Sequence, residues 1–238
     1  MIGGTTRLVG LLRDPVASSL SPRMQNAAFA ARALDVAYVP LGVAPALLAD
    51  AVRGLVAFDF LGANVTTPHK RAVVALCDEV EGDVESVNTF VIRDGRVLGS
   101  STDTEALGDR RPATAAVVGA GGAALAWIAE LEARGAAVDV FSRKGVWPPR
   151  TEDAELVVQA TPVKDELLFE PRPGQTVIEL AYRAEGGETA HAAAARAAGC
   201  ELVDGLDVLV AQGAASFERW TGLPAPVDVM RAAVRSPA

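Results

Sequence analysis

The segment Asn64-Val65-Thr66-Thr67-Pro68-His69-Lys70 gathers several groups that could take part in chemistry. It ends the apolar run of residues 60–65, a predicted strand, and leads into a predicted helix after Pro68. Polar side chains at the carboxyl end of a strand lie where an open α/β sheet presents groups to a ligand. A lysine there can donate to a substrate oxygen, and it can transfer a proton when its surroundings lower its pKa. Taken alone, helix capping by Thr66 or Thr67 with Lys70 on the surface is the better explanation.

A second pattern, Gly119-x-Gly121-x-x-Ala124, follows the apolar residues 115–118 and opens a helical pattern over residues 123–134. A dinucleotide site requires this strand–turn–helix context. Glycines let a pyrophosphate approach the backbone, and the helix N-terminus offers N–H groups and the positive end of its dipole. A tight turn, as in many α/β proteins, is the alternative. The residues predicted to bind the pyrophosphate are Gly119, Ala120, Gly121, Gly122 and Ala123.

The next predicted strand, residues 138–141, runs out into Ser142-Arg143-Lys144. An NAD site usually places a carboxylate there to hold the ribose 2′-hydroxyl, whereas two cations and a hydroxyl suit a 2′-phosphate. We therefore favour NADP over NAD and predict that Ser142, Arg143 and Lys144 bind the cofactor. A solvated basic turn is the alternative.

The overall composition limits the partners of the chain. Its net charge of −8 is spread without a block of Lys or Arg, so we expect neither nucleic acid nor membrane as a partner. The cysteines Cys77 and Cys200 and the histidines His69 and His191 lack metal-ligand spacing, so we predict no metal. The N-terminus lacks a signal-peptide pattern, and we expect a cytoplasmic protein. Monomer and homodimer both stay open.

The order of the predicted elements indicates an α/β fold. The first hundred residues alternate strands at 8–12, 37–41 and 60–65 with helices that begin at Ser21-Pro22 and Pro45, and they end in a hairpin across Asp94-Gly95. A second series has strands at 115–118, 138–141, 155–159 and 176–180, and helices at 206–220 and 226–235 close the chain. Such alternation predicts parallel sheets with helices on their faces.

Two more clusters, Ser18-Ser19-Leu20-Ser21-Pro22 and Thr102-Asp103-Thr104, would be interpreted as helix caps if found alone. In their order along the chain, however, all these motifs closely resemble the motif series of the shikimate dehydrogenases. The series continues with Ser86-Val87-Asn88-Thr89, Gln159-Ala160-Thr161-Pro162, Tyr182, Thr189, Gly205-Leu206-x-x-Leu209-Val210-x-Gln212 and Phe217-x-x-Trp220-Thr221-Gly222. The resemblance spans nearly the whole chain.

This resemblance implies two α/β domains. A substrate-binding domain of residues 1–105 is completed by the C-terminal helices in residues 206–238, and a shortened NADP-binding Rossmann domain occupies residues 106–205. The chain would take NADP(H) as its cofactor, with Thr161 as a further contact, and a small carboxylate as its substrate.

The resemblance also implies roles for single residues. Lys70 and Asp103 match the catalytic pair of the family, in which the lysine ammonium protonates the ketone oxygen and the carboxylate orients the amine. Ser19 and Ser21 are expected to hold the substrate carboxylate. The residues expected to contact the ring hydroxyls are Thr66, Asn88, Asp103 and Gln212, with Tyr182 as a neighbour.

Several positions depart from the pattern of the family. Ser18, Ser101, Val208 and Glu179 stand where members often carry His, Asn, Met and Asp. Residues 144–154 include two prolines and are too short for the helix that the family places there. We therefore expect a Rossmann domain reduced on its adenosine side.

The leading hypothesis is an NADP-dependent enzyme of aromatic amino acid biosynthesis that interconverts 3-dehydroshikimate and shikimate. One alternative is a paralogue that acts on quinate or an aminoshikimate, because the departures could reshape the pocket. The other is a non-catalytic binding or regulatory homologue with impaired cofactor binding. The presence of both Lys70 and Asp103 argues against that last alternative.

Overall fold

The computed structural model describes residues 2–15, 19–82 and 84–236, so Ser18 lies outside the described residues. The described chain divides into two compact units. The first unit comprises the residues up to Thr102 together with Val210–Ser236, and the second comprises Asp103–Leu209.

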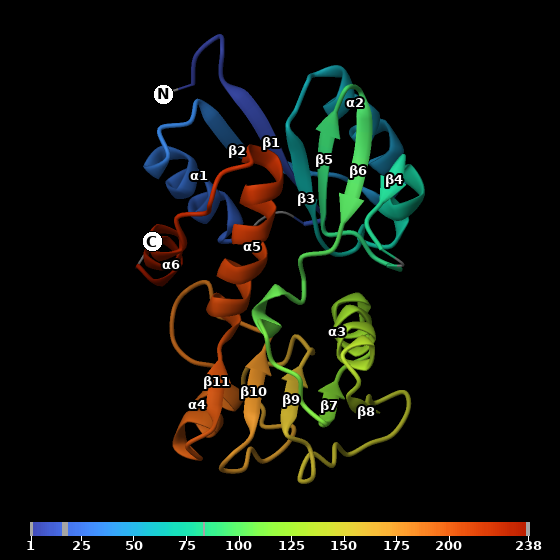
Figure 1. The fold of residues 1–238 in the computed structure, drawn as a ribbon, viewed down its shortest axis with the longest axis vertical. Helices are drawn as coiled ribbons and strands as arrows, with labels where there is room; N and C mark the ends of the chain where they lie inside the picture. The colour runs from blue at the N-terminus through green and yellow to red at the C-terminus, as the bar shows by residue number, and fades with distance from the viewer. Residues whose placement is uncertain (1, 16–18, 83, 237–238) are drawn as a thin grey trace. The chain divides into compact units, whose positions relative to one another are not determined.

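The first unit is built on a six-stranded sheet in the order β2-β1-β3-β5-β6-β4 (Figure 1). β1 pairs in parallel with β2 and β3, whereas β5 runs antiparallel to both β3 and β6. The strands are β1 (Arg7–Arg13), β2 (Val36–Gly42), β3 (Gly62–Val65), β4 (Glu79–Val80), β5 (Thr89–Arg93) and β6 (Arg96–Ser100). The three predicted strands and the hairpin across Asp94-Gly95 are confirmed.

Helices cover both faces of this sheet. Ala63 and Val65 of β3 pack in one buried cluster with the apolar side of α2. Because side chains alternate along a strand, Asn64 points to the opposite face, where it contacts Ser216 of α5. The helices are α1 (Ser21–Ala31), α2 (Leu48–Ala57), α5 (Gly205–Thr221, from Val210 on in this unit) and α6 (Val227–Arg235), with 3-10 turns η1 (Pro45–Leu47) and η2 (Ala72–Leu76).

The second unit contains a five-stranded parallel sheet in the order β11-β10-β9-β7-β8. The chain moves from β7 to β8 on one side and then to β9 on the other, so the strand order reverses at β7. Open α/β sheets bind ligands at such a switch point. The elements are η3 (Glu105–Leu107), β7 (Thr114–Val118), α3 (Gly122–Ala133), β8 (Ala137–Phe141), β9 (Leu156–Gln159), β10 (Thr176–Glu179), α4 (Ala190–Ala197) and β11 (Glu201–Val203).

The β8 side of this sheet is reduced. β8 is an edge strand, and residues 142–155 form neither a helix nor a strand after it. The prediction that residues 144–154 are too short for a helix is therefore confirmed. Val140, Val146 and Trp147 are exposed there.

Some elements differ from the predictions made from the sequence. The helix predicted after Pro68 is only the 3-10 turn η2, which begins at Ala72. The backbone around Pro68 instead forms a tight turn in which the His69 N–H donates to the Thr66 carbonyl. The short strands β4 and β11 and the Ala-rich helix α4 were not predicted, because two or three residues or a run of alanines give no apolar period.

The helices that the structure describes include none with both the length and the apolar character needed to cross a bilayer.

Gly62 offers a test of the packing between α5 and the first sheet. Its φ is +154°, and a Cβ there would lie 2.1 Å from the Phe90 carbonyl oxygen and 2.8 Å from Trp220 Nε1. That carbonyl accepts the Trp220 indole N–H at 3.0 Å. We expect Gly62→Ala to lower the free energy of unfolding by about 3 kcal/mol, measured by urea denaturation. Gly54→Ala, in open space on α2, should instead stabilise by about 0.5–1 kcal/mol.

Candidate active site

The topology of the first unit brings several of the predicted site residues to one edge of the sheet. Thr66 follows the carboxyl end of β3, and Asn88 precedes β5, which runs in the opposite direction. Thr102 follows β6, whose last residue, Ser100, pairs with Thr89 at the start of β5. Segments far apart in the sequence therefore present their polar side chains together.

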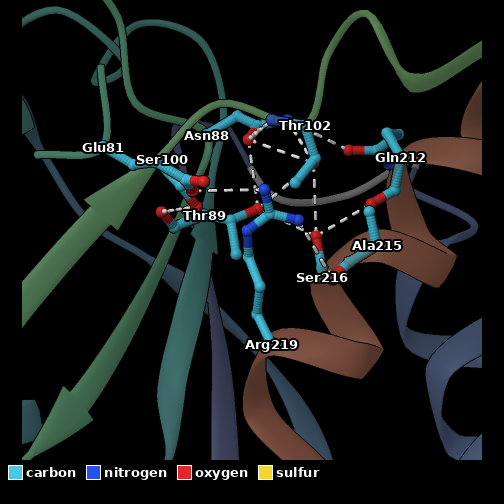
Figure 2. A network of polar contacts seen from close by, with 9 residues as sticks. All are labelled: Glu81, Asn88, Thr89, Ser100, Thr102, Gln212, Ala215, Ser216 and Arg219. Carbon is cyan, nitrogen blue, oxygen red and sulfur yellow. Dashed lines mark hydrogen bonds and ion pairs between the residues drawn. The ribbon is translucent and has the colours of Figure 1, made fainter. Parts of the chain in front are cut away.

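A network of buried hydrogen bonds organises this edge, and Figure 2 shows the part of it around Asn88, Thr89 and Ser216. The Asn64 amide nitrogen donates to Thr89 Oγ1 at 2.9 Å and to Ser216 Oγ at 3.0 Å, and Asn64 Oδ1 accepts the Tyr38 hydroxyl at 2.8 Å. Asn64 therefore ties β2, β3, β5 and α5 together. It belongs to the segment singled out in the sequence, where the structure gives it a packing function.

Asn88 and Gln212, both predicted to contact substrate, meet in the same network. Asn88 Nδ2 donates to Gln212 Oε1 at 3.3 Å and to Thr102 Oγ1 at 3.0 Å. Asn88 Oδ1 accepts the backbone N–H of Thr102 at 2.8 Å. Asn88 is 2% exposed, so its amide orientation is set by these contacts.

Lys70 lies at the end of a turn that is anchored by hydrogen bonds to two other segments of the chain. The buried His69 ring nitrogen Nε2 lies 2.8 Å from the Val43 carbonyl oxygen, and the Thr66 N–H donates to the Leu12 carbonyl at 3.1 Å. The Lys70 carbonyl accepts the Val87 N–H at 2.9 Å, which joins the lysine to the residue before Asn88. Lys70 itself is half-buried.

The two serines predicted to hold a carboxylate lie at the start of α1. Ser21 is the first residue of the helix and is buried, and its N–H donates to Ser19 Oγ at 3.2 Å. A helix N-terminus with hydroxyl groups is suited to an anion.

The remaining substrate-site predictions fall in the second unit. Asp103 is its first residue, directly after Thr102, and Tyr182 follows β10. Both side chains are half-buried. The structure therefore places Ser19, Ser21, Thr66, Lys70, Asn88 and Gln212 in one unit, and Asp103 and Tyr182 in the other.

The glycine turn of the second unit lies directly after β7, at the switch point. Gly119 has φ +136°, and a Cβ there would lie 2.8 Å from the Ala160 carbonyl oxygen, so this glycine is required by the neighbouring strand end. Gly121 and Gly122 differ, because a Cβ at either would meet nothing within 4 Å. No side chain caps α3, whose first residue is Gly122. The turn therefore has the open backbone that a pyrophosphate needs.

Other predicted cofactor contacts lie just after the strands that flank β7. Ser142, Arg143 and Lys144 follow β8, and Thr161 follows β9, where its N–H donates to Gln159 Oε1 at 2.5 Å. Since the strands are parallel, all these residues lie at the carboxyl edge of one sheet, together with Ala120 of the turn and Ala123 in the first turn of α3.

Two residues that were not predicted from the sequence lie beside Arg143. Its guanidinium lies 5.5 Å from the centre of the Trp147 ring. Its Nη2 atom lies 3.4 Å from Glu166 Oε2, an exposed ion pair that puts a negative charge beside the group predicted to bind a 2′-phosphate. No local sequence signal joins positions 143 and 166, which lie on loops after different strands.

Of the departures from the family pattern, Ser101, Val208 and Glu179 lie in the described residues. The Ser101 hydroxyl oxygen is buried without a hydrogen-bond partner among the described residues. Val208 is buried in an apolar cluster of the second unit.

A buried carboxyl and imidazole face each other in the second unit. His191 Nε2 accepts the Leu168 N–H at 2.9 Å, so the proton of the neutral ring sits on Nδ1, 3.7 Å from Glu179 Oε2. Burial raises the pKa of Glu179 to about 8, and burial lowers the pKa of His191 to about 4. Both groups are therefore neutral between these values.

The fold and the two sites define a class of protein, a dehydrogenase built from an α/β substrate-binding unit and a Rossmann-like unit for a dinucleotide. A family model described as the shikimate dehydrogenase substrate binding domain matches residues 11–90, and one for the shikimate 5′-dehydrogenase C-terminal domain matches residues 205–235. The shikimate dehydrogenase (NADP(+)) of Anaeromyxobacter sp. (strain Fw109-5) is 39% identical over 279 residues, covering 100% of this chain and 99% of that protein.

Solved structures agree with these matches. The shikimate 5-dehydrogenase of Thermus thermophilus, in complex with NADP(H) and shikimate, has a TM-score of 0.84 and 30% identity over 97% of this chain and 98% of its own. A quinate dehydrogenase from Corynebacterium glutamicum, in complex with NAD, has a TM-score of 0.78 and 27% identity over 96% of this chain and 98% of its own. The chain belongs to the shikimate dehydrogenase family.

The pair Glu179 and His191 predicts how stability depends on pH. Above about pH 6.5 the folded state holds a proton on Glu179 that the unfolded state has lost, so stability falls as the pH rises toward 8. Below about pH 4.5 the unfolded state protonates the imidazole that the folded state keeps neutral, so stability falls again. Between these limits the two effects cancel.

Urea unfolding at a series of pH values checks this expectation. Glu179→Gln keeps the shape of the protonated carboxyl, and it should remove the part of the decline above pH 6.5 that this group causes, at most about 1.4 kcal/mol per pH unit. An identical decline in the variant would show that Glu179 is ionised in the folded protein.

Proposed function

We propose that the chain catalyses the NADP-dependent interconversion of 3-dehydroshikimate and shikimate. The observation that carries this proposal is a similarity to a shikimate dehydrogenase (NADP(+)) that covers the whole chain, including the positions of Lys70 and Asp103. The convergence of Thr66, Asn88 and Gln212 on one sheet edge supports it. We assign the protein to the cytoplasm.

The first unit is proposed to bind the substrate. Ser19 and Ser21, at the start of α1, hold the carboxylate through their hydroxyl groups and the helix N-terminus. Thr66, Asn88 and Gln212 contact the ring hydroxyls. Gln212 Oε1 accepts from Asn88, and this contact orients the Gln212 amide beside the proposed ring site.

Lys70 and Asp103 are proposed as the catalytic pair, and Tyr182 as a further substrate contact. In the reducing direction the Lys70 Nζ ammonium donates its proton to the ketone oxygen, and in the oxidising direction the neutral amine accepts the proton of the ring hydroxyl. Asp103 is proposed to orient the amine. The anchored turn that ends at Lys70 fixes the backbone from which this side chain extends.

The second unit is proposed to bind NADP(H), which supplies the hydride when it is bound. The residues present fit this group, because Gly121 and Gly122 leave the backbone open at a switch point and Arg143 carries the charge for a 2′-phosphate. Ser142, Lys144 and Thr161 complete the proposed contacts.

Quinate is a second candidate substrate. The buried Ser101 hydroxyl lacks a partner among the described residues, at a position where the family often carries Asn. A smaller side chain with a spare hydroxyl would accommodate a ring with one more hydroxyl group, so quinate belongs in every assay beside shikimate.

Replacement of Lys70 tests the mechanism. We expect Lys70→Ala to lower kcat for shikimate oxidation by about 10²–10⁴-fold, because the reaction loses the group that accepts the hydroxyl proton. The affinity for NADP+, measured by titration, should stay within about twofold. Arg71→Ala is the control, since it removes an exposed cation from the adjacent position, and it should keep the wild-type kcat. Full activity of Lys70→Ala would exclude the proposed acid–base role.

Replacement of Glu166 tests the assignment of Arg143. Because Glu166 competes with a 2′-phosphate for the guanidinium, Glu166→Gln should tighten NADP+ binding by about two- to fivefold, as expected from an exposed ion pair. NAD+ binding should change by less than about twofold, because NAD+ lacks the 2′-phosphate. Isothermal titration of both cofactors gives the comparison. Equal changes for the two would contradict the contact between Arg143 and the 2′-phosphate.

A further inference from the structure

Ser216 occupies the centre of the buried network on α5, one helical turn after Gln212 (Figure 2). Its side chain is 0% exposed. Ser216 Oγ lies 2.8 Å from Thr89 Oγ1 and 3.0 Å from Asn64 Nδ2, and it donates to the Gln212 carbonyl oxygen at 2.9 Å. This one hydroxyl group therefore joins the helix to two strands of the sheet.

The single proton of the Ser216 hydroxyl determines the direction of these bonds. Because Ser216 donates that proton to the Gln212 carbonyl, Ser216 Oγ accepts from Asn64 Nδ2. The Thr89 hydroxyl also has a single proton, which it shares between Ser216 Oγ at 2.8 Å and Asn88 Oδ1 at 3.1 Å. Both donors are on buried residues. Loss of the Ser216 oxygen would remove one acceptor from this buried network, so Asn64 and Thr89 would keep their contacts with each other and with Asn88.

The geometry points to Ser216 as a positioning residue for substrate binding, and this inference rests on the proposed function. Ser216 anchors the backbone of Gln212 directly, and through Thr89 it anchors the strand that follows Asn88. The two amides then meet at 3.3 Å in a fixed orientation. This hydroxyl contacts Asn64, Thr89, Thr102 and Gln212. All four residues belong to the first unit, and none is a proposed cofactor contact.

Steady-state kinetics of Ser216→Ala test the inference. The change removes one oxygen atom from a helical position and leaves the volume of the site almost unchanged. We expect kcat/KM for shikimate to fall about tenfold, mainly through a higher KM, as for the loss of one buried hydrogen-bond partner. The KM for NADP+ should stay within about twofold, a split that a general loss of folded protein would not produce.

The matched control is Ser100→Ala. Ser100 is also buried, but its hydroxyl donates to the Thr89 carbonyl at 3.4 Å and belongs to β6. This variant should keep the wild-type KM for shikimate. A KM that rises as much as in Ser216→Ala would contradict a specific role for Ser216.

A double-mutant cycle shows whether Ser216 acts through Gln212. In a Gln212→Ala background, Ser216→Ala should lower kcat/KM by less than it does in the wild-type chain, because one of the two amides that it positions is already absent. An equal loss in both backgrounds would overturn the inference, as would an unchanged shikimate KM in Ser216→Ala. Absence of shikimate turnover by the wild-type chain would instead contradict the proposed function, and the inference would fall with it.

Discussion

The side-chain amide of Asn64 has both its oxygen and its nitrogen committed inside the first unit. The oxygen accepts the Tyr38 hydroxyl, and the nitrogen donates to Thr89 and Ser216. A buried amide with missing partners would cost more than an apolar residue in its place, so these contacts must form together. They fix α5 on the sheet face opposite α2, and α5 carries Gln212. The proposed substrate site therefore depends on a residue that we do not expect to touch the substrate.

The second unit follows a different constraint. Gly119 is required in the turn at the switch point because Ala160 lies too close for a side chain there. Gly121 and Gly122, in contrast, have no neighbour in the described structure that requires glycine. Ligand binding explains those two residues better than packing does. The sheet stops at β8, and Arg143 is paired with Glu166 rather than enclosed by further structure. The chain has a net charge of −8, so its overall charge does not attract a phosphorylated cofactor. The proposed recognition of the 2′-phosphate therefore depends on Arg143 and Lys144.

Local signals in the sequence were sufficient for much of the fold. The strand before Gly119, the Ser21-Pro22 helix start and the Asp94-Gly95 hairpin each have a sequence signature, and all three appear in the structure. The strand β4 has only two residues, so it shows no alternation of apolar and polar side chains that could predict it. Contacts between distant positions had no signal either, since Asn64 and Ser216 are 152 residues apart and Arg143 and Glu166 are 23 apart on separate loops. The catalytic roles of Lys70 and Asp103 were inferred from the order of the family motifs along the chain. These roles remain predictions.

The central claim is that this chain oxidises shikimate with NADP+. Initial rates of the wild-type protein with shikimate or quinate, each combined with NADP+ or NAD+, test it most directly. We predict the highest kcat/KM for shikimate with NADP+, because Arg143 suits the 2′-phosphate and the family resemblance favours shikimate. A preference for quinate with NAD+ would contradict both assignments. No turnover in any of the four combinations would contradict the account as a whole.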